Sequence, residues 1–327
     1  MRHLKFLPLY LLLGACGADP AVTPDGSSGP SLDGQVTNDG AAADHDAATS
    51  DGSAAHQDST ASGEGDTIAD EVQPGTRFGL NAEGTHFTLT HDGVPRLMLP
   101  LESMTLGSVP AIDDTLNYDP YYLEPGDDFA ALYDPPAGLS WHEVTGASTA
   151  SSDEETTHYA LTLADGREAG LSVTHPGAGR VRLHWTPPTE GAPVVFFRFS
   201  PTIDSEEGLY GLGEVFDHVN HRGRVRAMQI ELAELESGYN EVHVPVPLLT
   251  GTTGWGIFVE SMRPGVFACA TDSEETVRVT FGVREAAPEG LVVHLFSADH
   301  PLDIVGRYYD VTGRPGPIGE WAMGPWI

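Results

Sequence analysis

Residues 85–99 read THFTLTHDGVPRLML, two short runs of alternating residues on either side of an Asp-Gly pair. Apolar side chains recur at every second position of each run, which is the period of a β-strand with one buried face. Asp92-Gly93 suits a two-residue hairpin turn, because both turn positions need positive φ angles. The stretch therefore predicts an antiparallel hairpin.

The same pattern recurs downstream, including a second Asp-Gly pair at Asp165-Gly166. Short alternating or nearly continuous apolar runs occupy residues 159–163, 170–174, 180–185, 194–197, 277–281 and 291–296. Many short strands separated by Gly and Pro are typical of sandwiches and barrels. We expect an all-β fold, a large antiparallel β-sandwich, over residues 76–298.

One helix is expected after these strands. Asp299 suits the N-cap, Pro301 the first turn, and Gly313 the end of the helix. The apolar stripe consists of Ile304, Val305 and Tyr308. A helix after a run of strands indicates the start of a different architecture.

Charge excludes several functions. The 327 residues contain 16 Lys and Arg against 48 Asp and Glu, a formal net charge of −32. A nucleic-acid binder needs clustered cations to displace the counterions of a polyanion, and a basic membrane-surface patch needs them as well. We therefore expect neither nucleic-acid binding nor electrostatic membrane binding.

The N-terminal residues predict an export signal. A basic start and a short apolar run lead to Leu13-Gly14-Ala15-Cys16. The run is too short to span a bilayer, and the last four residues resemble a bacterial lipobox. We interpret residues 1–15 as a lipoprotein signal peptide and Cys16 as the lipidation site, which predicts an exported chain held by lipid on the periplasmic or cell-surface side. An ordinary signal peptide that contains a Cys is the alternative.

Residues 16–75 predict a disordered acidic tether. Ala, Asp, Gly, Ser and Thr dominate, and no Lys or Arg occurs between Lys5 and Arg77. Such a segment cannot bury enough apolar surface to offset the entropy of ordering. Its Asp-Gly pairs are unevenly spaced, which disfavours a calcium repeat. The second cysteine, Cys269, lies in a strand-like run and predicts a buried, inert thiol.

Residues 102–141 mix acids, tyrosines, prolines and glycines. Acids and tyrosines can hydrogen-bond to a sugar and stack on it, but the same composition suits a long exposed loop. The sequence favours the exposed loop.

Several stretches in order carry a family resemblance: GLYGLGE (208–214), HVPVPLL (243–249), GWGIFVE (254–260), and residues 302–326 with their TGRP and WAMGPW motifs. Together they resemble the N-terminal β-sandwich of glycoside hydrolase family 31, the family of α-glucosidases, α-xylosidases and sulfoquinovosidases. The resemblance implies a galactose-mutarotase-like sandwich, then a linking helix and the first strand of a (β/α)8 barrel over residues 299–327, where the chain is expected to be truncated.

The resemblance also bears on catalysis. The family's two catalytic aspartates lie on later barrel strands, so no residue of this chain is expected to be catalytic, and neither a metal nor a cofactor is implied. In the family one sandwich loop reaches the barrel mouth, and its counterpart here lies between Arg222 and Tyr239. Arg222, Arg224 and Glu231 are the candidate substrate-loop residues, since guanidinium groups can hold sugar hydroxyls or an anionic substituent. The alternative is a strand whose arginines pair with acids such as Glu231.

Two functional hypotheses follow. The first is the N-terminal, carbohydrate-facing part of an exported α-glycosidase, inactive alone, with an α-glycoside and a separately encoded barrel domain as its partners. The second is a stand-alone carbohydrate-binding or scaffolding lipoprotein. A mutarotase would need a His and a Glu that converge in the sandwich, and the pair His218 and His221 lacks further ligands at zinc-site spacing.

Overall fold

A computed structural model describes residues 75–317, except residues 117, 125–133, 178, 216, 230–241 and 284–288 and the side chain of residue 243. The expected lipidation site Cys16, the tether up to residue 74, Glu231 and the expected barrel strand at 320–327 lie outside the described residues. The strands are β1 Thr76–Leu80, β2 His86–His91, β3 Val94–Pro100, β4 Thr105–Ser108, β5 Ser140–Ser152, β6 Thr156–Leu163, β7 Glu168–Gly177, β8 Arg180–Thr186, β9 Val194–Phe199, β10 Leu209–Val215, β11 Arg224–Ala227, β12 Val242–Gly251, β13 Trp255–Glu260, β14 Gly265–Cys269, β15 Val277–Gly282 and β16 Leu291–Ser297. Two short 3-10 helices, η1 Leu101–Ser103 and η2 Pro120–Leu123, and one α-helix, α1 Asp303–Thr312, complete the described elements.

Both Asp-Gly hairpins form as the sequence predicts. β2 and β3 pair antiparallel, and the turn residues Asp92 and Gly93 have φ angles of 48° and 76°. β6 and β7 also pair antiparallel, and Gly166 in their turn has a φ of 83°. Positive φ at these positions is the reason that Asp-Gly is favoured there.

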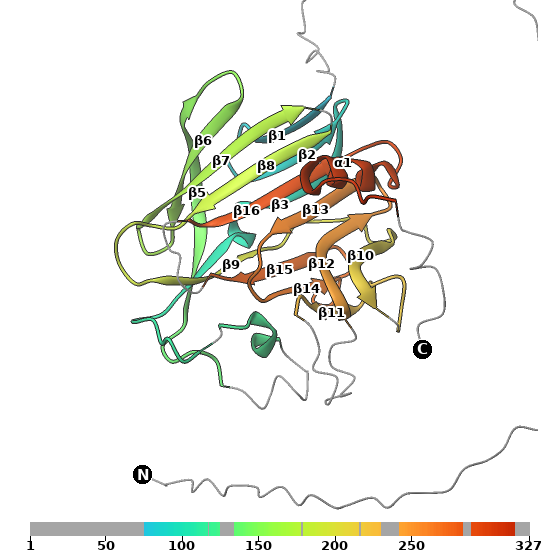
Figure 1. Ribbon diagram of the computed structural model, residues 1–327. Coiled ribbons are helices and arrows are strands. Elements are labelled where there is room, and N and C mark those ends of the chain that lie inside the picture. The colour runs from blue at the N-terminus through green and yellow to red at the C-terminus, as the bar shows by residue number, and fades with distance from the viewer. Residues whose placement is uncertain are drawn as a thin grey trace, which may run out of the picture. The chain divides into compact units, whose positions relative to one another are not determined.

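The fold is a two-layer antiparallel β-sandwich, as expected. Thirteen strands of the described chain follow the order β10-β12-β13-β16-β8-β7-β6-β5-β4-β9-β15-β14-β11, and β1-β2-β3 form a separate sheet (Figure 1). The long strand β5 belongs to both layers, because Ser140 to Glu143 pair with β4 and Val144 to Ser152 pair with β6. One continuous ladder therefore folds into a first layer, from β10 to β5, and a second layer, from β4 to β11.

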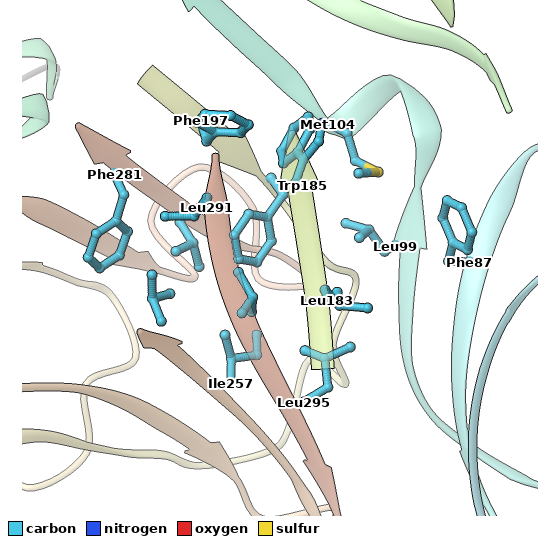
Figure 2. Close-up of a cluster of buried hydrophobic side chains, with 14 of the residues drawn as sticks. Phe87, Leu99, Met104, Leu183, Trp185, Phe197, Ile257, Phe281, Leu291 and Leu295 are labelled. Carbon is cyan, nitrogen blue, oxygen red and sulfur yellow. The ribbon is translucent and has the colours of Figure 1, made fainter. Parts of the chain in front are cut away.

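The core lies between these layers, and the inner side chains of the small sheet β1-β2-β3 belong to it. Trp185 of β8 meets Phe197 of β9 edge to face, with ring centroids 4.8 Å apart, and Phe87 of β2 meets Tyr159 of β6 at 5.0 Å. Figure 2 shows Leu183, Ile257 and Leu295 among the same buried side chains. Burial of each such side chain contributes roughly 1.5–3 kcal/mol, so the described sandwich has a core of its own.

Helix α1 packs on the outer face of the first layer, against β13 and β16 (Figure 1). Ile304 is fully buried there, and Gly313 ends the helix with a φ of 88°. The expected start was wrong: Leu302 is the N-cap, and the Asp299 carboxylate instead accepts a hydrogen bond of 2.9 Å from Arg96.

Within the part of the chain that the structure describes, we find no helix with the length and hydropathy needed to cross a bilayer.

The exposed-loop interpretation of residues 102–141 was wrong for its start, where Thr105–Ser108 form the buried strand β4, and for its middle part. Tyr118 and Tyr121 are buried, and both pack against the outer face of the second layer, on β9 and on β11 and β14 respectively. Asp119 caps η2 by accepting a hydrogen bond of 2.9 Å from the N–H of Tyr121. The segment therefore covers a sheet face and shapes the surface around it.

Candidate functional site

The Gly-Leu-Gly motif of β10 allows an unusually close approach to β12. Gly211 and Gly213 have φ angles of 112° and 95°. A Cβ at Gly211 would lie 2.2 Å from the carbonyl oxygen of Leu248, and one at Gly213 would lie 1.9 Å from that of Val244. Only glycine fits both the backbone angle and the space. The motif is thus a requirement of the β10–β12 pairing, which also carries register shifts here.

Leu212 between these glycines has a φ of 63° although its side chain is fully buried. A positive φ in a bulky residue costs roughly 1–3 kcal/mol and persists only where the surroundings enforce it. The enforcing contacts include the bond from His221 Nε2 to the Gly211 carbonyl, 2.8 Å, and the bond from the His221 N–H to the Leu209 carbonyl, 2.8 Å. The connection from β10 to β11 therefore holds β10 in its strained shape.

Arg222 joins three segments. Its Nε donates to the carbonyl of Glu207 at 2.9 Å, and its two terminal nitrogens donate to the carbonyls of Glu274 and Asp204, each at 2.6 Å. These acceptors lie before β10 and in the turn between β14 and β15. The guanidinium thus ties the β10–β11 connection to both layers, and a role in binding substrate stays a prediction.

Arg226 and Arg224 both point to one carboxylate. Arg226 is buried, and its Nη2 donates to both Asp217 oxygens at 2.7 and 2.9 Å. Arg224 reaches Asp217 only at 3.7 Å, and 42% of its side chain is exposed. Arg226 and Arg224 therefore both pair with Asp217, and of these two arginines Arg224 is the more exposed and the more available to a ligand.

His221 is neutral in this network. Arg226 Nε donates to its Nδ1 at 3.2 Å, so the proton must be on Nε2, which donates to a carbonyl. Burial lowers the pKa of His221, and the charge of Arg226 acts in the same direction. Both ring nitrogens are used and the side chain is buried, which leaves no free ligand atom for the zinc site considered from the sequence.

Asp217 stays ionised. Burial by itself raises the pKa of Asp217, but the hydrogen bonds from Arg226 and from the N–H of His218, together with the charges of both arginines, hold that pKa below its ordinary value. Sequence reasoning missed Asp217 because it searched downstream of the arginines, toward Glu231. The available signal was an acid on the other side of the same cluster.

A buried carboxylate supports the GWG motif. Glu207 accepts hydrogen bonds from Trp255 Nε1 at 3.0 Å and from Thr253 Oγ1 at 2.9 Å. Gly251 lies against both partners, since a Cβ there would be 2.3 Å from the Trp255 ring and 2.4 Å from Glu207. The turn between β12 and β13 is therefore fixed by a buried polar contact. Nothing in the local sequence pattern indicated this contact.

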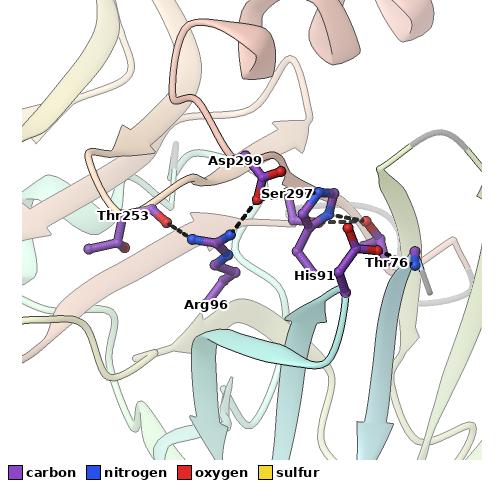
Figure 3. Close-up of polar contacts among 8 residues, drawn as sticks. Thr76, His91, Arg96, Thr253, Ser297 and Asp299 are labelled. Atoms are coloured by element: carbon purple, nitrogen blue, oxygen red, sulfur yellow. Dashed lines mark hydrogen bonds and ion pairs between the residues drawn. The ribbon is translucent and has the colours of Figure 1, made fainter. Parts of the chain in front are cut away.

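One cluster has the geometry of cation ligands, at the junction of the small sheet and β16 (Figure 3). Ligand atoms of His91, Asp92 and Asp299 lie within 4.8 Å of one another. Arg96 donates to Asp299 at 2.9 Å, and His91 Nδ1 lies 3.0 Å from Ser297 Oγ. The guanidinium occupies the position of a cation, so we interpret the cluster as a structural junction.

The structure also places one His beside one Glu, which raises the question of a mutarotase site. His294 Nε2 lies 2.9 Å from Glu260 Oε2, and the ring stacks on Phe258 at 5.7 Å. A mutarotase needs its acid and base on either side of a sugar. These two groups instead contact each other, and the His294 side chain is 8% exposed, so the pair does not form such a site.

Cys269 is buried, and burial raises its pKa to about 12. The interpretation of an inert thiol is consistent with both properties, because the reactive species is the thiolate.

Comparison with known proteins supports a relation to glycoside hydrolase family 31. No family model matches the chain. Over 123 residues it is 28% identical to an alpha-xylosidase of Emericella nidulans, a match that covers 37% of this chain and 15% of the relative. Over 201 residues it is 22% identical to an isomaltosyltransferase of Sporosarcina globispora, covering 58% of this chain and 18% of the relative.

The fold is also found in a solved structure. A sulfoquinovosidase of glycoside hydrolase family 31 from E. rectale matches with a TM-score of 0.50 at 15% identity, over 75% of this chain and 35% of that one. The chain thus spans less than a fifth of the length of the two curated relatives. The two sequence matches support a relation to enzymes such as the alpha-xylosidase and the isomaltosyltransferase. The structural match shows that this chain and the sulfoquinovosidase share the fold.

Proposed function

We propose that this chain is the N-terminal β-sandwich domain of an exported, lipid-anchored enzyme that hydrolyses α-glycosides. In this proposal the segment between β11 and β12 faces the substrate, and Arg224 and Glu231 contact the terminal sugar. Catalysis needs two carboxylates on opposite sides of the anomeric carbon. The resemblance assigns these to barrel strands that follow a sandwich of this kind, so we expect the 327 residues alone to be inactive.

The observation that carries the proposal is the arrangement of the resemblance motifs. GLYGLGE, HVPVPLL and GWGIFVE become β10, β12 and β13, three consecutive neighbours at one edge of the first layer. Helix α1 packs on β13 and β16 beside them. Stretches that are separate in sequence thus form one structural unit, which favours common descent over chance likeness of each motif.

The exposure of Arg224 supports the proposed contact with a sugar. A guanidinium with unused N–H groups can donate to hydroxyls, and Arg224 is the one of the three clustered arginines that is neither clamped on carbonyls nor buried. The ion pair between Arg226 and Asp217 ties β11 to the connection that precedes it. The proposal thus assigns Arg224 to recognition and Arg222 and Arg226 to support.

Hydrolysis of p-nitrophenyl α-glycosides tests this function. The assay compares the 327-residue chain with the same chain extended by the reading frame that follows codon 327. We expect turnover only in the extended protein, and there an Arg224→Gln substitution should raise KM about 10-fold, the value of one lost charged hydrogen bond. Turnover by the 327 residues alone, or none by an extension that contains a barrel, would contradict the proposal.

The second hypothesis, a carbohydrate-binding or scaffolding lipoprotein, is favoured by the separate core of the sandwich. A stop codon after Ile327, followed by unrelated sequence, would support it over the enzyme.

A further inference from the structure

A cavity of about 570 Å³ lies on the outer face of the second layer. We name it the Trp141 cleft, and its lining includes Tyr122, Leu123, Pro136, Leu139, Trp141 and Arg198. Its volume is in the range of small-molecule sites, roughly 300–1,000 Å³. Most of the lining residues have apolar side chains, about half of the lining surface is nevertheless polar, and Arg198 is the charged residue among them.

The floor of the cleft depends on one glycine. Gly107 of β4 pairs with Trp141 of β5 on one side and with Phe196 of β9 on the other. A Cβ at Gly107 would lie 3.1 Å from both of these side chains. The Trp141 ring can therefore extend across β4 and stack on Phe196, with centroids 5.9 Å apart.

Arg198 presents its guanidinium to this cleft. The guanidinium carbon lies 3.9 Å from the centroid of the Trp141 ring, and Nε donates to Thr280 Oγ1 at 3.0 Å. Its two terminal nitrogens have no hydrogen-bond partner among the described residues. Stacking and the single Nε bond thus orient the group, while its terminal N–H groups stay available for a ligand.

The acids near Arg198 form ion pairs with another arginine, Arg278. Arg278 donates to Asp272 at 2.5 Å and also forms an ion pair with Glu124. Burial lowers the pKa of Arg198 to about 10, and the charge of Arg278 contributes to this shift. Arg198 is therefore cationic at neutral pH in surroundings that do not supply enough negative charge to offset its burial.

These features describe one type of ligand. Two adjacent N–H groups of a guanidinium match a carboxylate, which they can bind bidentately. Proline, leucine and aromatic walls suit the C–H faces of a sugar ring. The net charge of −32 opposes an anion only weakly, because screening limits exposed charges to about 8 Å at physiological ionic strength.

We propose that the Trp141 cleft binds the carboxylate of an acidic sugar, with Arg198 on the carboxylate and the apolar walls on the ring. The proposal does not depend on the glycosidase function, since every residue in it lies on the sandwich itself.

Titration of the full chain followed by protein NMR tests the proposal with three probes: D-glucuronate, D-glucose and acetate. Glucuronate combines the sugar ring with the carboxylate, glucose has only the ring, and acetate has only the carboxylate. We expect glucuronate to bind at least about 10-fold more tightly than either other probe. Equal binding of glucose and glucuronate, equal binding of acetate and glucuronate, or no response to glucuronate would overturn the proposal.

Variants locate the site. Arg198→Gln should weaken glucuronate binding at least about 10-fold. Arg182→Gln is the matched control, because Arg182 is also a partly buried strand arginine but lies on the first layer. The affinity of this variant for glucuronate should equal that of the original chain. Ala137→Glu is a second test that spares Arg198: Ala137 is exposed and lines the cleft, so a carboxylate there should occupy the guanidinium and also weaken binding at least about 10-fold. Unchanged affinity in both cleft variants would overturn the assignment.

Discussion

Replacement of Gly213 by Ala tests the explanation of the Gly-Leu-Gly motif. At a φ of 95°, an L-residue costs about 1–2 kcal/mol. The new Cβ would also lie 1.9 Å from the Val244 carbonyl oxygen and 2.7 Å from the Val246 nitrogen. Both are backbone atoms of β12, so the clash can be relieved only by moving the strand.

Movement of β12 should weaken one or two ladder hydrogen bonds, each worth about 0.5–1.5 kcal/mol. The free energy of unfolding should therefore fall by about 2–5 kcal/mol in total. In a folded region of this size, each kcal/mol lowers Tm by about 2–4 °C. Urea unfolding followed by tryptophan fluorescence measures the change, and the m-value should stay the same.

Gly166→Ala is the matched control. Gly166 has a φ of 83°, close to that of Gly213, but no atom lies within 4 Å of the added Cβ. It should lose only the backbone term, about 1–2 kcal/mol. If the two variants lose the same stability, the close approach of β10 to β12 contributes nothing and our account of the motif is wrong.

Three further predictions concern two carboxylates and the thiols. Glu207→Ala leaves the buried Trp255 N–H without an acceptor and should cost about 1–3 kcal/mol in urea unfolding. Asp217→Asn should destabilise the chain at pH 7. Because the folded-state pKa of Asp217 is lowered, only the ionised carboxylate adds stability, so the difference in the free energy of unfolding between the original chain and the variant should shrink as the pH falls below the ordinary carboxyl pKa of about 4. In a Cys16→Ser chain, which should also lose its lipid and its membrane attachment, Cys269 should resist a thiol reagent at pH 8 until denaturant is added, since burial raises its pKa to about 12.

Each has a result that would contradict it. A Glu207→Ala chain as stable as the original would show that water satisfies the indole. An Asp217→Asn difference that grows in acid would reverse the assigned sign. Rapid labelling of the native thiol would show that Cys269 is accessible, and lipid incorporation into Cys16→Ser would exclude Cys16 as the acceptor.

Local patterns predicted most of the strands. Phe87 and Leu89 alternate with polar residues. Because successive side chains of a strand point to opposite faces, this alternation predicts that Phe87 and Leu89 are buried, whatever element covers them. The Asp-Gly turns were equally local. The start of the helix at Asp303 could not be predicted locally. The Asp299 carboxylate accepts a hydrogen bond from Arg96, which is 203 residues away in sequence, and does not cap the helix.

The candidate site shows the same division. The arginine cluster was visible as a local concentration of charge, but its partners were not. Arg222 donates to carbonyls of residues 204, 207 and 274, and backbone acceptors leave no trace in a sequence. Nor could any local pattern show that Gly107 allows Trp141 to reach Phe196, since that contact spans two strand pairings.

By itself, the sequence determined the β class of this protein, its two Asp-Gly hairpins, its acidic charge and the order of its resemblance motifs, since each depends on neighbouring residues or on composition. The tertiary structure alone decided which polar groups meet: Asp217 with two arginines, Glu207 with Trp255, and Arg198 with Trp141. Antiparallel strands bring together residues far apart in sequence, and the strand order that does so is set by packing of the whole core.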